Sequence, residues 1–184
     1  MPLIREVIVT SLTADGTPHL APLGLIADGA RWIAAPFAPS TTLANLRAVP
    51  ELIANYVDDV RIFAGCLTGR RDFPLLPATS LRPPRLAGAL AHTELRVVAV
   101  DEDPLRPRFH CDIVFEASHA PFRGFNRAQA AVIEAAILFS RRHLLERATI
   151  EDEMRRLAVA VVKTAGPEEE TAWGWLVAAL GIEV

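Results

Sequence analysis

The chain has 184 residues, a formal net charge of -3 and an apolar share of 51%, and its length suits one domain or one domain with an appended piece. The mild acidity argues against a nucleic-acid partner, and no uninterrupted apolar run is long enough to span a membrane. The first residues carry a charge pair where a signal peptide has its apolar core, so we expect a cytoplasmic protein. The high apolar share indicates that a second subunit covers part of the surface, so we expect a homodimer.

The first part of the chain predicts a meander of three strands. Residues 6–12 (EVIVTSL) are rich in β-branched side chains and indicate a strand. Asp15-Gly16 is a strong turn signal, and residues 19–26 return as a second strand that Pro22 and Gly24 interrupt. A second turn leads into the third strand, over residues 31–35.

A hydroxyl-rich turn follows this meander. Ser40, Thr41 and Thr42 precede a short helix expected over residues 43–48, and residues 52–57 form the next strand. Hydroxyl side chains at a helix start can cap its exposed N–H groups. The same N–H groups, with the positive end of the helix dipole, also suit a phosphate. The sequence leaves both interpretations open, although the absence of a glycine-rich cradle excludes a P-loop.

This order of elements resembles the FMN-binding split barrels, the superfamily of pyridoxamine-phosphate-oxidase-like and flavin-reductase-like proteins. The motifs that carry the resemblance are Thr10-Ser11, Asp15-Gly16, Pro18, Ala21-Pro22-Leu23-Gly24, Ser40-Thr41-Thr42, Asn45-Leu46 and Asn55. Within the superfamily, the chain is most similar to an uncharacterised flavoprotein family of archaea and methylotrophic bacteria. That narrower likeness adds Asp58-Asp59, Phe63 and Gly124-Phe125-Asn126-Arg127-Ala128.

The resemblance implies an α+β fold, with an antiparallel split β-barrel over residues 1–120 and a C-terminal helical subdomain over residues 121–184 packed on the barrel. It implies FMN as the cofactor, with the phosphate at the hydroxyl turn and the ring against the second strand. The residues expected to contact FMN are His19, Ala21, Pro22, Gly24, Ser40, Thr41, Thr42, Asn45, Asn55, Asn126 and Arg127. The last two lie at the start of a later helix. No basic residue lies between Ala34 and Leu46, so the charge opposite the phosphate is expected from Arg127 or a partner subunit.

The middle of the chain predicts a helix, a long loop and a hairpin. Asp58 or Asp59 would cap a helix that ends at residue 67, and capping and catalysis are both open roles for this carboxylate pair. Residues 73–86 contain four prolines and predict a surface loop, either a lid or a passive connection. Strands are expected over residues 86–100 and 108–118.

Alternation in the second hairpin strand places Phe109, Cys111, Ile113 and Phe115 on one face, with His110 and Asp112 on the other. No third ligand follows His110 and Asp112 at a familiar spacing, so we expect no metal site. Cys66 and Cys111 lie far apart in the sequence, and we expect both to be buried thiols.

The last sixty or so residues predict helices. Asn126 would cap the longest helix, which is expected over residues 127 to about 147. Asn126 and Arg127 have either a structural role or a contact with a ligand, and the sequence leaves both interpretations open. Thr149 would cap a second helix over residues 150–165, and Pro167 would open the last. The apolar stripe of the second helix comprises Ile150, Met154, Leu157, Val161 and Val162.

The sequence contains no dinucleotide fingerprint, no nucleophile elbow and no metal-ligand cluster, so an enzyme with this sequence would take its chemistry from a cofactor. Two hypotheses follow from the flavin resemblance. The first is an FMN-dependent oxidoreductase that acts on a small molecule at a dimer interface, linked by the narrower likeness to pterin-dependent one-carbon metabolism. The second is a non-catalytic flavin-binding or protein-assembly module. The sequence identifies no catalytic residue.

Overall fold

The computed structural model describes residues 2–183, and its contacts divide the chain into two compact units. The first unit runs to Val57 and resumes over Phe73–Pro121, and the second comprises Asp58–Asp72 and the chain from Phe122 onward. The sequence predicts a boundary between residues 120 and 121, whereas the contacts also separate Asp58–Asp72 from the barrel. Within the part that the structure describes, no helix has the length and apolar character needed to cross a membrane.

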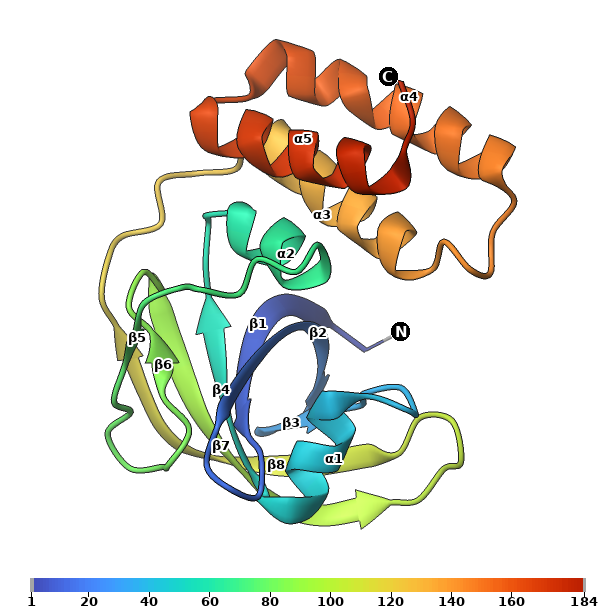
Figure 1. Ribbon diagram of the computed structural model, residues 1–184. Coiled ribbons are helices and arrows are strands. Elements are labelled where there is room, and N and C mark those ends of the chain that lie inside the picture. Colours follow the sequence, from blue (N-terminus) through green and yellow to red (C-terminus); the bar gives the residue numbers. More distant parts are fainter. Residues whose placement is uncertain (1, 184) are drawn as a thin grey trace. The chain divides into compact units, whose positions relative to one another are not determined.

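The first unit is a closed antiparallel barrel, in which the strands follow the order β1-β2-β3-β8-β7-β4 (Figure 1). The strands are β1 Ile4–Leu12, β2 Pro18–Asp28, β3 Arg31–Ala34, β4 Glu51–Tyr56, β7 Ala91–Asp101 and β8 Arg108–Ser118. The predicted barrel, with helices elsewhere in the chain, is therefore confirmed. β8 has the bounds that its alternating pattern and flanking turns indicated.

Strand β1 is buried on both of its faces. Val7 and Val9 point into the barrel core, and Ile8 and Thr10, on the opposite face, are also fully buried. A strand covered on both sides reads as a nearly continuous apolar run instead of a strict alternation, which explains the EVIVTSL pattern.

Helix α1, Thr41–Ala48, lies across one end of the barrel (Figure 1). Leu46 is 2% exposed and belongs to the barrel core, against which Leu43 also packs. The N–H of Val49 donates to the carbonyl of Asn45 at 2.7 Å and closes the helix. The packing of α1 on the core thus fixes the direction of its first turn, where the hydroxyl residues lie.

The pairing of β7 with β8 is interrupted, and this corrects one prediction. Phe109 and Cys111 lie in the barrel core on one face, as the alternation predicts, and Ile113 continues this face opposite Leu95, although it is 40% exposed. Phe115 leaves the predicted face. The pairing changes from Leu95 with Ile113 to Glu94 with Phe115, so Val114 has no residue opposite it. An extra residue of this kind is a β-bulge, and it ends the regular alternation of faces.

The proline-rich segment is largely irregular, as predicted, but it contains one short ladder. Leu75–Leu76 (β5) pairs antiparallel with Arg85–Leu86 (β6). The N–H of Ala87 donates to the carbonyl of Pro74 at 2.9 Å and closes the same loop.

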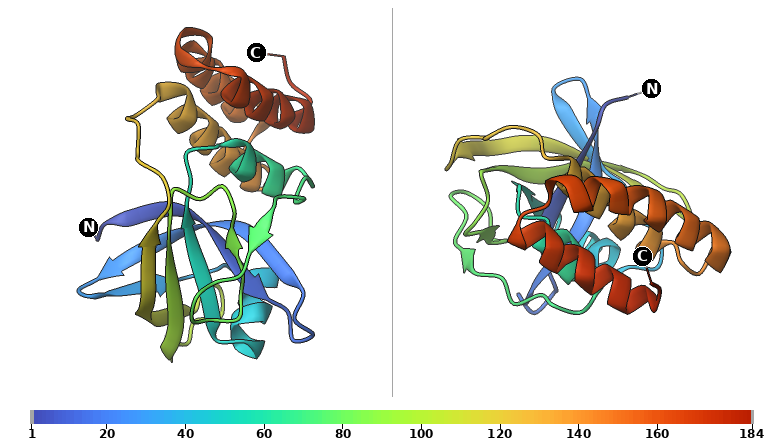
Figure 2. Two further views of the ribbon diagram at one scale, coloured as in Figure 1. Left: turned by 90° about the vertical axis from the view of Figure 1, so that its left-hand side faces the viewer. Right: turned by 90° about the horizontal axis from the view of Figure 1, so that it is seen from above.

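The second unit consists of helices α2 Arg61–Leu67, α3 Arg127–Ser140, α4 Arg147–Thr164 and α5 Pro167–Leu180. Figure 2 shows α4 and α5 side by side, and both helices contact α3. Their shared core includes Val132, Met154, Ala172 and Leu176, which are fully buried.

Three predictions about these helices are wrong. The helix expected to reach residue 147 ends at Ser140, and the guanidinium of Arg142 lies 4.1 Å from the centre of the Phe139 ring, where it also donates to the Phe139 carbonyl at 2.9 Å. The next helix accordingly starts at Arg147, before the expected cap Thr149. Val162 is 86% exposed, because it lies about 100° around the helix from its buried neighbour at position 161.

Candidate functional site

The start of α1 combines a capped end with free hydrogen-bond donors. Ser40 has extended backbone angles, and its hydroxyl accepts from the N–H of Leu43 at 3.2 Å. Its carbonyl accepts from the N–H of Ala44 at 3.1 Å. The N-cap interpretation of the hydroxyl turn is therefore correct for Ser40. It does not account for the next two residues.

Thr41 and Thr42 have unused polar groups at this helix start. No residue within 2–183 pairs with the backbone N–H or the hydroxyl of either threonine. Thr41 is exposed, whereas Thr42 is only 5% exposed. Free N–H groups at a helix N-terminus attract anions because the helix dipole is positive there. The turn can therefore accept an oxyanion without loss of the Ser40 cap.

Two arginines from outside the turn lie in this part of the barrel unit, and one of them is paired with a carboxylate. Arg106 donates from Nε to the carbonyl of Ala35 at 3.0 Å and lies 4.7 Å from the centre of the Phe37 ring. Arg47, on α1, pairs with Glu102 at 2.6 Å beside a hollow of about 390 Å³. The sequence did not indicate either arginine as a neighbour of the turn, because Arg47 lies after the helix start and Arg106 follows β7.

Asn45 connects α1 to the barrel. It is 3% exposed, and its amide nitrogen donates to the hydroxyl of the fully buried Ser11 at 2.9 Å. Ser11 lies opposite His19 in the β1–β2 ladder. The structure therefore brings the predicted residues Asn45 and His19 to the same end of the barrel, one on each side of Ser11.

Asn55 has protein partners for both of its amide atoms. Its nitrogen donates to the carbonyl of Ile8 at 3.0 Å and to the hydroxyl of Thr10 at 3.1 Å. Its oxygen accepts from the N–H of Leu86 at 2.7 Å, and the side chain is fully buried. Asn55 thus joins β4, β1 and β6, and this structural role accounts for an asparagine in the middle of a buried strand.

The predicted residues of β2 lie on two faces. Ala21 is paired with Val9 and packs against the barrel core, whereas Pro22 is paired with Ile8, which points the other way. Gly24 follows on the same face as Pro22, and a methyl group there would lie 2.9 Å from Cγ2 of a neighbouring isoleucine, Ile4. The space beside Gly24 is therefore filled by the side chains of Ile4 and Glu6.

Asn126 and Arg127 belong to the helical unit. The Asn126 oxygen caps α3 by accepting from the N–H of Ala128 at 2.7 Å, and its nitrogen donates to the carbonyl of Thr164 at 2.9 Å. This confirms the predicted cap and adds a link to α4. Arg127 is exposed.

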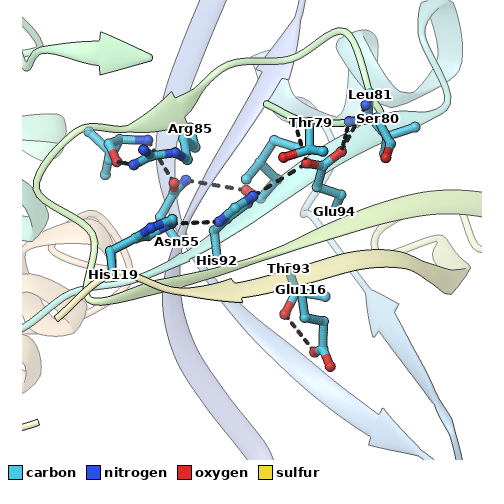
Figure 3. A network of polar contacts seen from close by, with 12 residues as sticks. Asn55, Thr79, Ser80, Leu81, Arg85, His92, Thr93, Glu94, Glu116 and His119 are labelled. Carbon is cyan, nitrogen blue, oxygen red and sulfur yellow. Dashed lines mark hydrogen bonds and ion pairs between the residues drawn. The ribbon is translucent and has the colours of Figure 1, made fainter. Parts of the chain in front are cut away.

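A second polar cluster was missed from the sequence, and Figure 3 shows it. Glu94 is fully buried, and its carboxylate accepts from the backbone N–H groups of Thr79, Ser80 and Leu81 at 2.6, 2.8 and 2.8 Å. Nε2 of His92, which is 2% exposed, lies 3.3 Å from the same carboxylate. The partners of Glu94 are mainly backbone groups of a loop, and such groups have no signature in the sequence.

The charge state of this cluster follows from its surroundings. Burial alone raises the pKa of Glu94, but the three backbone N–H groups and His92 outweigh it, so the net pKa shift is downward. Because the ionised carboxylate only accepts, His92 must donate from Nε2. Its Nδ1 lies 2.9 Å from Nε2 of His119. Burial, Arg85 and His92 all lower the pKa of His119.

A model of the N-terminal domain of DUF447, a family of proteins of unknown function, matches residues 5–120, and the model of this family's other part matches residues 126–178. The chain belongs to this family. No functionally curated protein is detectably similar to it.

Solved structures share the fold. An FMN-bound DUF447 protein of Methanosarcina mazei is 20% identical, with 97% of this chain and 96% of that chain covered and a TM-score of 0.84. The 2-nitrobenzoate 2-nitroreductase of Pseudomonas fluorescens is 22% identical. The match covers 65% of this chain and 66% of the nitroreductase chain, with a TM-score of 0.54. A flavoredoxin from Methanosarcina acetivorans is 16% identical, with 65% and 69% covered and a TM-score of 0.52. The resemblance to FMN-binding split barrels is confirmed as a likeness of fold.

Proposed function

We propose that the protein binds FMN and that the start of α1 holds the phosphate. The observation that carries this proposal is Thr42, which is 5% exposed yet has neither its N–H nor its hydroxyl paired within residues 2–183. A phosphate oxygen would satisfy both groups, while Ser40 keeps its cap. The FMN-bound relative from Methanosarcina mazei, similar over nearly the whole chain, gives independent support.

The residues present fit this cofactor. Thr41 and Thr42 offer N–H and hydroxyl donors to a phosphate, and Arg106 adds a positive charge that is held beside the segment leading into α1. FMN itself would supply hydride or single-electron transfer, and the chain would bind and orient it.

We further propose that the protein is an oxidoreductase that acts on a small molecule. The nitroreductase of Pseudomonas fluorescens, which shares the barrel fold, supports this as an analogy of fold alone. A role beside pterin-dependent one-carbon metabolism stays a prediction of the family resemblance.

An absorbance spectrum of the purified protein tests the cofactor, and a second step tests the activity. Flavin bands in the blue and near-ultraviolet that remain after gel filtration would support FMN binding. Bleaching by a reduced nicotinamide, followed by reoxidation with an acceptor, would support the oxidoreductase. Bound flavin without any such turnover would favour the non-catalytic module. Failure to retain or bind added FMN would overturn the proposal.

We also propose a homodimer. Large apolar side chains of the barrel unit are exposed, among them Phe37 at 57%, Val98 at 47% and Leu105 at 69%, and a stable dimer interface of roughly 2,000 Å² or more would cover such groups. A monomeric mass in light scattering at micromolar concentration would contradict it.

A cytoplasmic location completes the proposal. Cys66 and Cys111 are both free and buried, as is usual in a reducing compartment. Fractionation of cells that express the full chain would test it, and recovery outside the cytoplasm would contradict it.

A further inference from the structure

A small hollow of about 270 Å³ lies where β4 ends and the paired ends of β7 and β8 meet it. Its polar side chains include Tyr56 from β4, Thr93 from β7 and Glu116 from β8. Thr93 lies directly opposite Glu116 in the ladder, so the register of the sheet brings these groups together. Neither the family resemblance nor the proposed phosphate site involves them.

The hydrogen bonds among these side chains have one consistent direction. The Thr93 hydroxyl donates to Oε1 of Glu116 at 2.9 Å. A threonine hydroxyl has only one hydrogen, so the contact of 3.1 Å between the oxygens of Thr93 and Tyr56 must be donated by the tyrosine. The donors of both hydroxyls are thus consumed within the chain of bonds. Lone pairs of Tyr56 and Glu116 are what remain for a ligand.

The other groups around the hollow add no positive charge. His92 also lines it, but both of its ring nitrogens are engaged, with Glu94 and His119. No lysine or arginine is among the residues that line the hollow in the described chain, and Glu116 has no cationic partner within residues 2–183. The Ser118 hydroxyl also lines the hollow and can donate or accept a hydrogen bond. The hollow therefore offers acceptors, this one hydroxyl and one negative charge.

Acceptors around a carboxylate bind a group that carries both hydrogen-bond donors and positive charge. A primary ammonium has three donors and a compact charge. The volume of about 270 Å³ is below the usual range for drug-sized ligands, so the ligand is small. We propose that Tyr56, Thr93 and Glu116 form a binding site for a small primary alkylammonium compound.

Titration of the full-length protein with n-butylamine at neutral pH, followed by two-dimensional NMR of the backbone amides, tests this site. Saturable shifts of the amides at Thr93 and Glu116 are expected at millimolar concentrations. Tetramethylammonium has the charge without N–H donors, and butyrate has the opposite charge, so neither should give saturable shifts there. These comparisons need no variant, and their outcome does not depend on whether flavin binds.

Variants then identify the groups. Glu116→Gln removes the charge, keeps the shape and should weaken butylamine binding by at least about tenfold. Tyr56→Phe should weaken it by less, since it removes one neutral acceptor. Asp72→Asn removes an exposed charge in the helical unit and should leave the affinity unchanged. Absence of saturable shifts in the parent protein, equal affinity for tetramethylammonium, or full affinity of the folded Glu116→Gln variant would overturn the proposal.

Discussion

Glu94 and His92 lie two residues apart on β7, and the buried imidazole donates to the buried carboxylate across 3.3 Å. Residues two apart on a strand point to the same face, so one face of β7 carries both groups. The carboxylate also holds the loop at Thr79, Ser80 and Leu81 through their backbone N–H groups. The Glu94 side chain therefore ties three consecutive residues of the proline-rich loop to the barrel, and Asn55 holds the same loop at Leu86.

Glu94→Gln should lower the free energy of unfolding by on the order of 3 kcal/mol, because hydrogen bonds to a charged group stabilise more than neutral ones. The amide nitrogen of glutamine would also face backbone N–H groups, which need an acceptor. Urea unfolding of the parent and the variant measures the difference. Glu102→Gln is the matched control, since Glu102 forms an exposed pair with Arg47 and its loss should matter far less.

The contribution of Glu94 should depend on pH in a defined direction. Its pKa is lowered from 4.5 in the folded protein, so the unfolded chain binds a proton more readily. This part of the stability is therefore present above about pH 4.5 and is lost as the pH falls through the folded-state pKa. Acid titration of the unfolding free energy should be shallower for Glu94→Gln than for the parent. Parallel acid titrations of the two proteins would contradict the assignment.

The pKa values of two histidines should be shifted in opposite directions from 6.5, upward for His110 and downward for His119. Hydrogen bonding to Asp101 at 2.8 Å, aided by Asp28, raises the pKa of His110 against burial, whereas burial, Arg85 and His92 lower that of His119. NMR titration of the imidazole resonances measures both, and Asp101→Asn should bring His110 back toward 6.5. A His110 pKa at or below that of His119 would refute this.

The raised pKa of His110 also determines how the stability of the protein changes with pH. Because the folded-state pKa of His110 is raised above 6.5, its contribution is fully present below pH 6.5 and is lost as the pH rises through the folded-state value. His110→Gln should therefore destabilise the protein more at mildly acidic than at alkaline pH. An equal loss at both, measured by urea unfolding, would count against the ion pair with Asp101.

The barrel could be predicted from the sequence because its strands carry local signals. β8 alternates and ends at turn residues, and β1 is rich in β-branched side chains. The end of α3 could not be predicted, since the residues after Ser140 (RRHLLE) contain no glycine or proline to stop a helix. Burial of Val161 but not Val162 is likewise decided by the packing of α4.

The candidate site divides in the same way. The cap at Ser40 follows from a local rule, and it was predicted. The cluster around Glu94 depends on backbone donors from a distant loop, and the hollow at Tyr56 depends on the register of three strands. The positive charge of Arg106 reaches its place only through the β7–β8 connection. These features depend on contacts between segments that are distant in the sequence, and local sequence patterns therefore could not predict them.

Both cysteines should be unreactive in the native protein. Burial raises the pKa of the Cys66 thiol to about 11 and that of Cys111 to about 12, and the thiolate is the reactive form. Alkylation by iodoacetamide at mildly alkaline pH should be slow for the folded chain and fast at both positions in denaturant. Rapid labelling of either cysteine in the folded protein would show that its side chain is more accessible than its packing indicates.

The last prediction separates the phosphate site from the helix cap. Changing Thr41 and Thr42 together to valine removes two hydroxyls that have no partner within residues 2–183, and Ser40→Ala removes the cap itself. The double variant should bind FMN roughly a hundredfold more weakly, since a hydrogen bond to a charged group contributes about 1.5–3 kcal/mol. Riboflavin, which has no phosphate, should lose much less.

Ser40→Ala should instead lower the free energy of unfolding by about 1 kcal/mol and should reduce the affinity for FMN and riboflavin alike, if at all. Fluorescence titration with each flavin and urea unfolding are carried out on the parent protein and on both variants. General damage to the fold would weaken both ligands equally, so the ratio of the FMN and riboflavin affinities is the decisive number. An unchanged ratio in the Thr41→Val, Thr42→Val variant would mean that the phosphate is held elsewhere, whatever the variant does to stability.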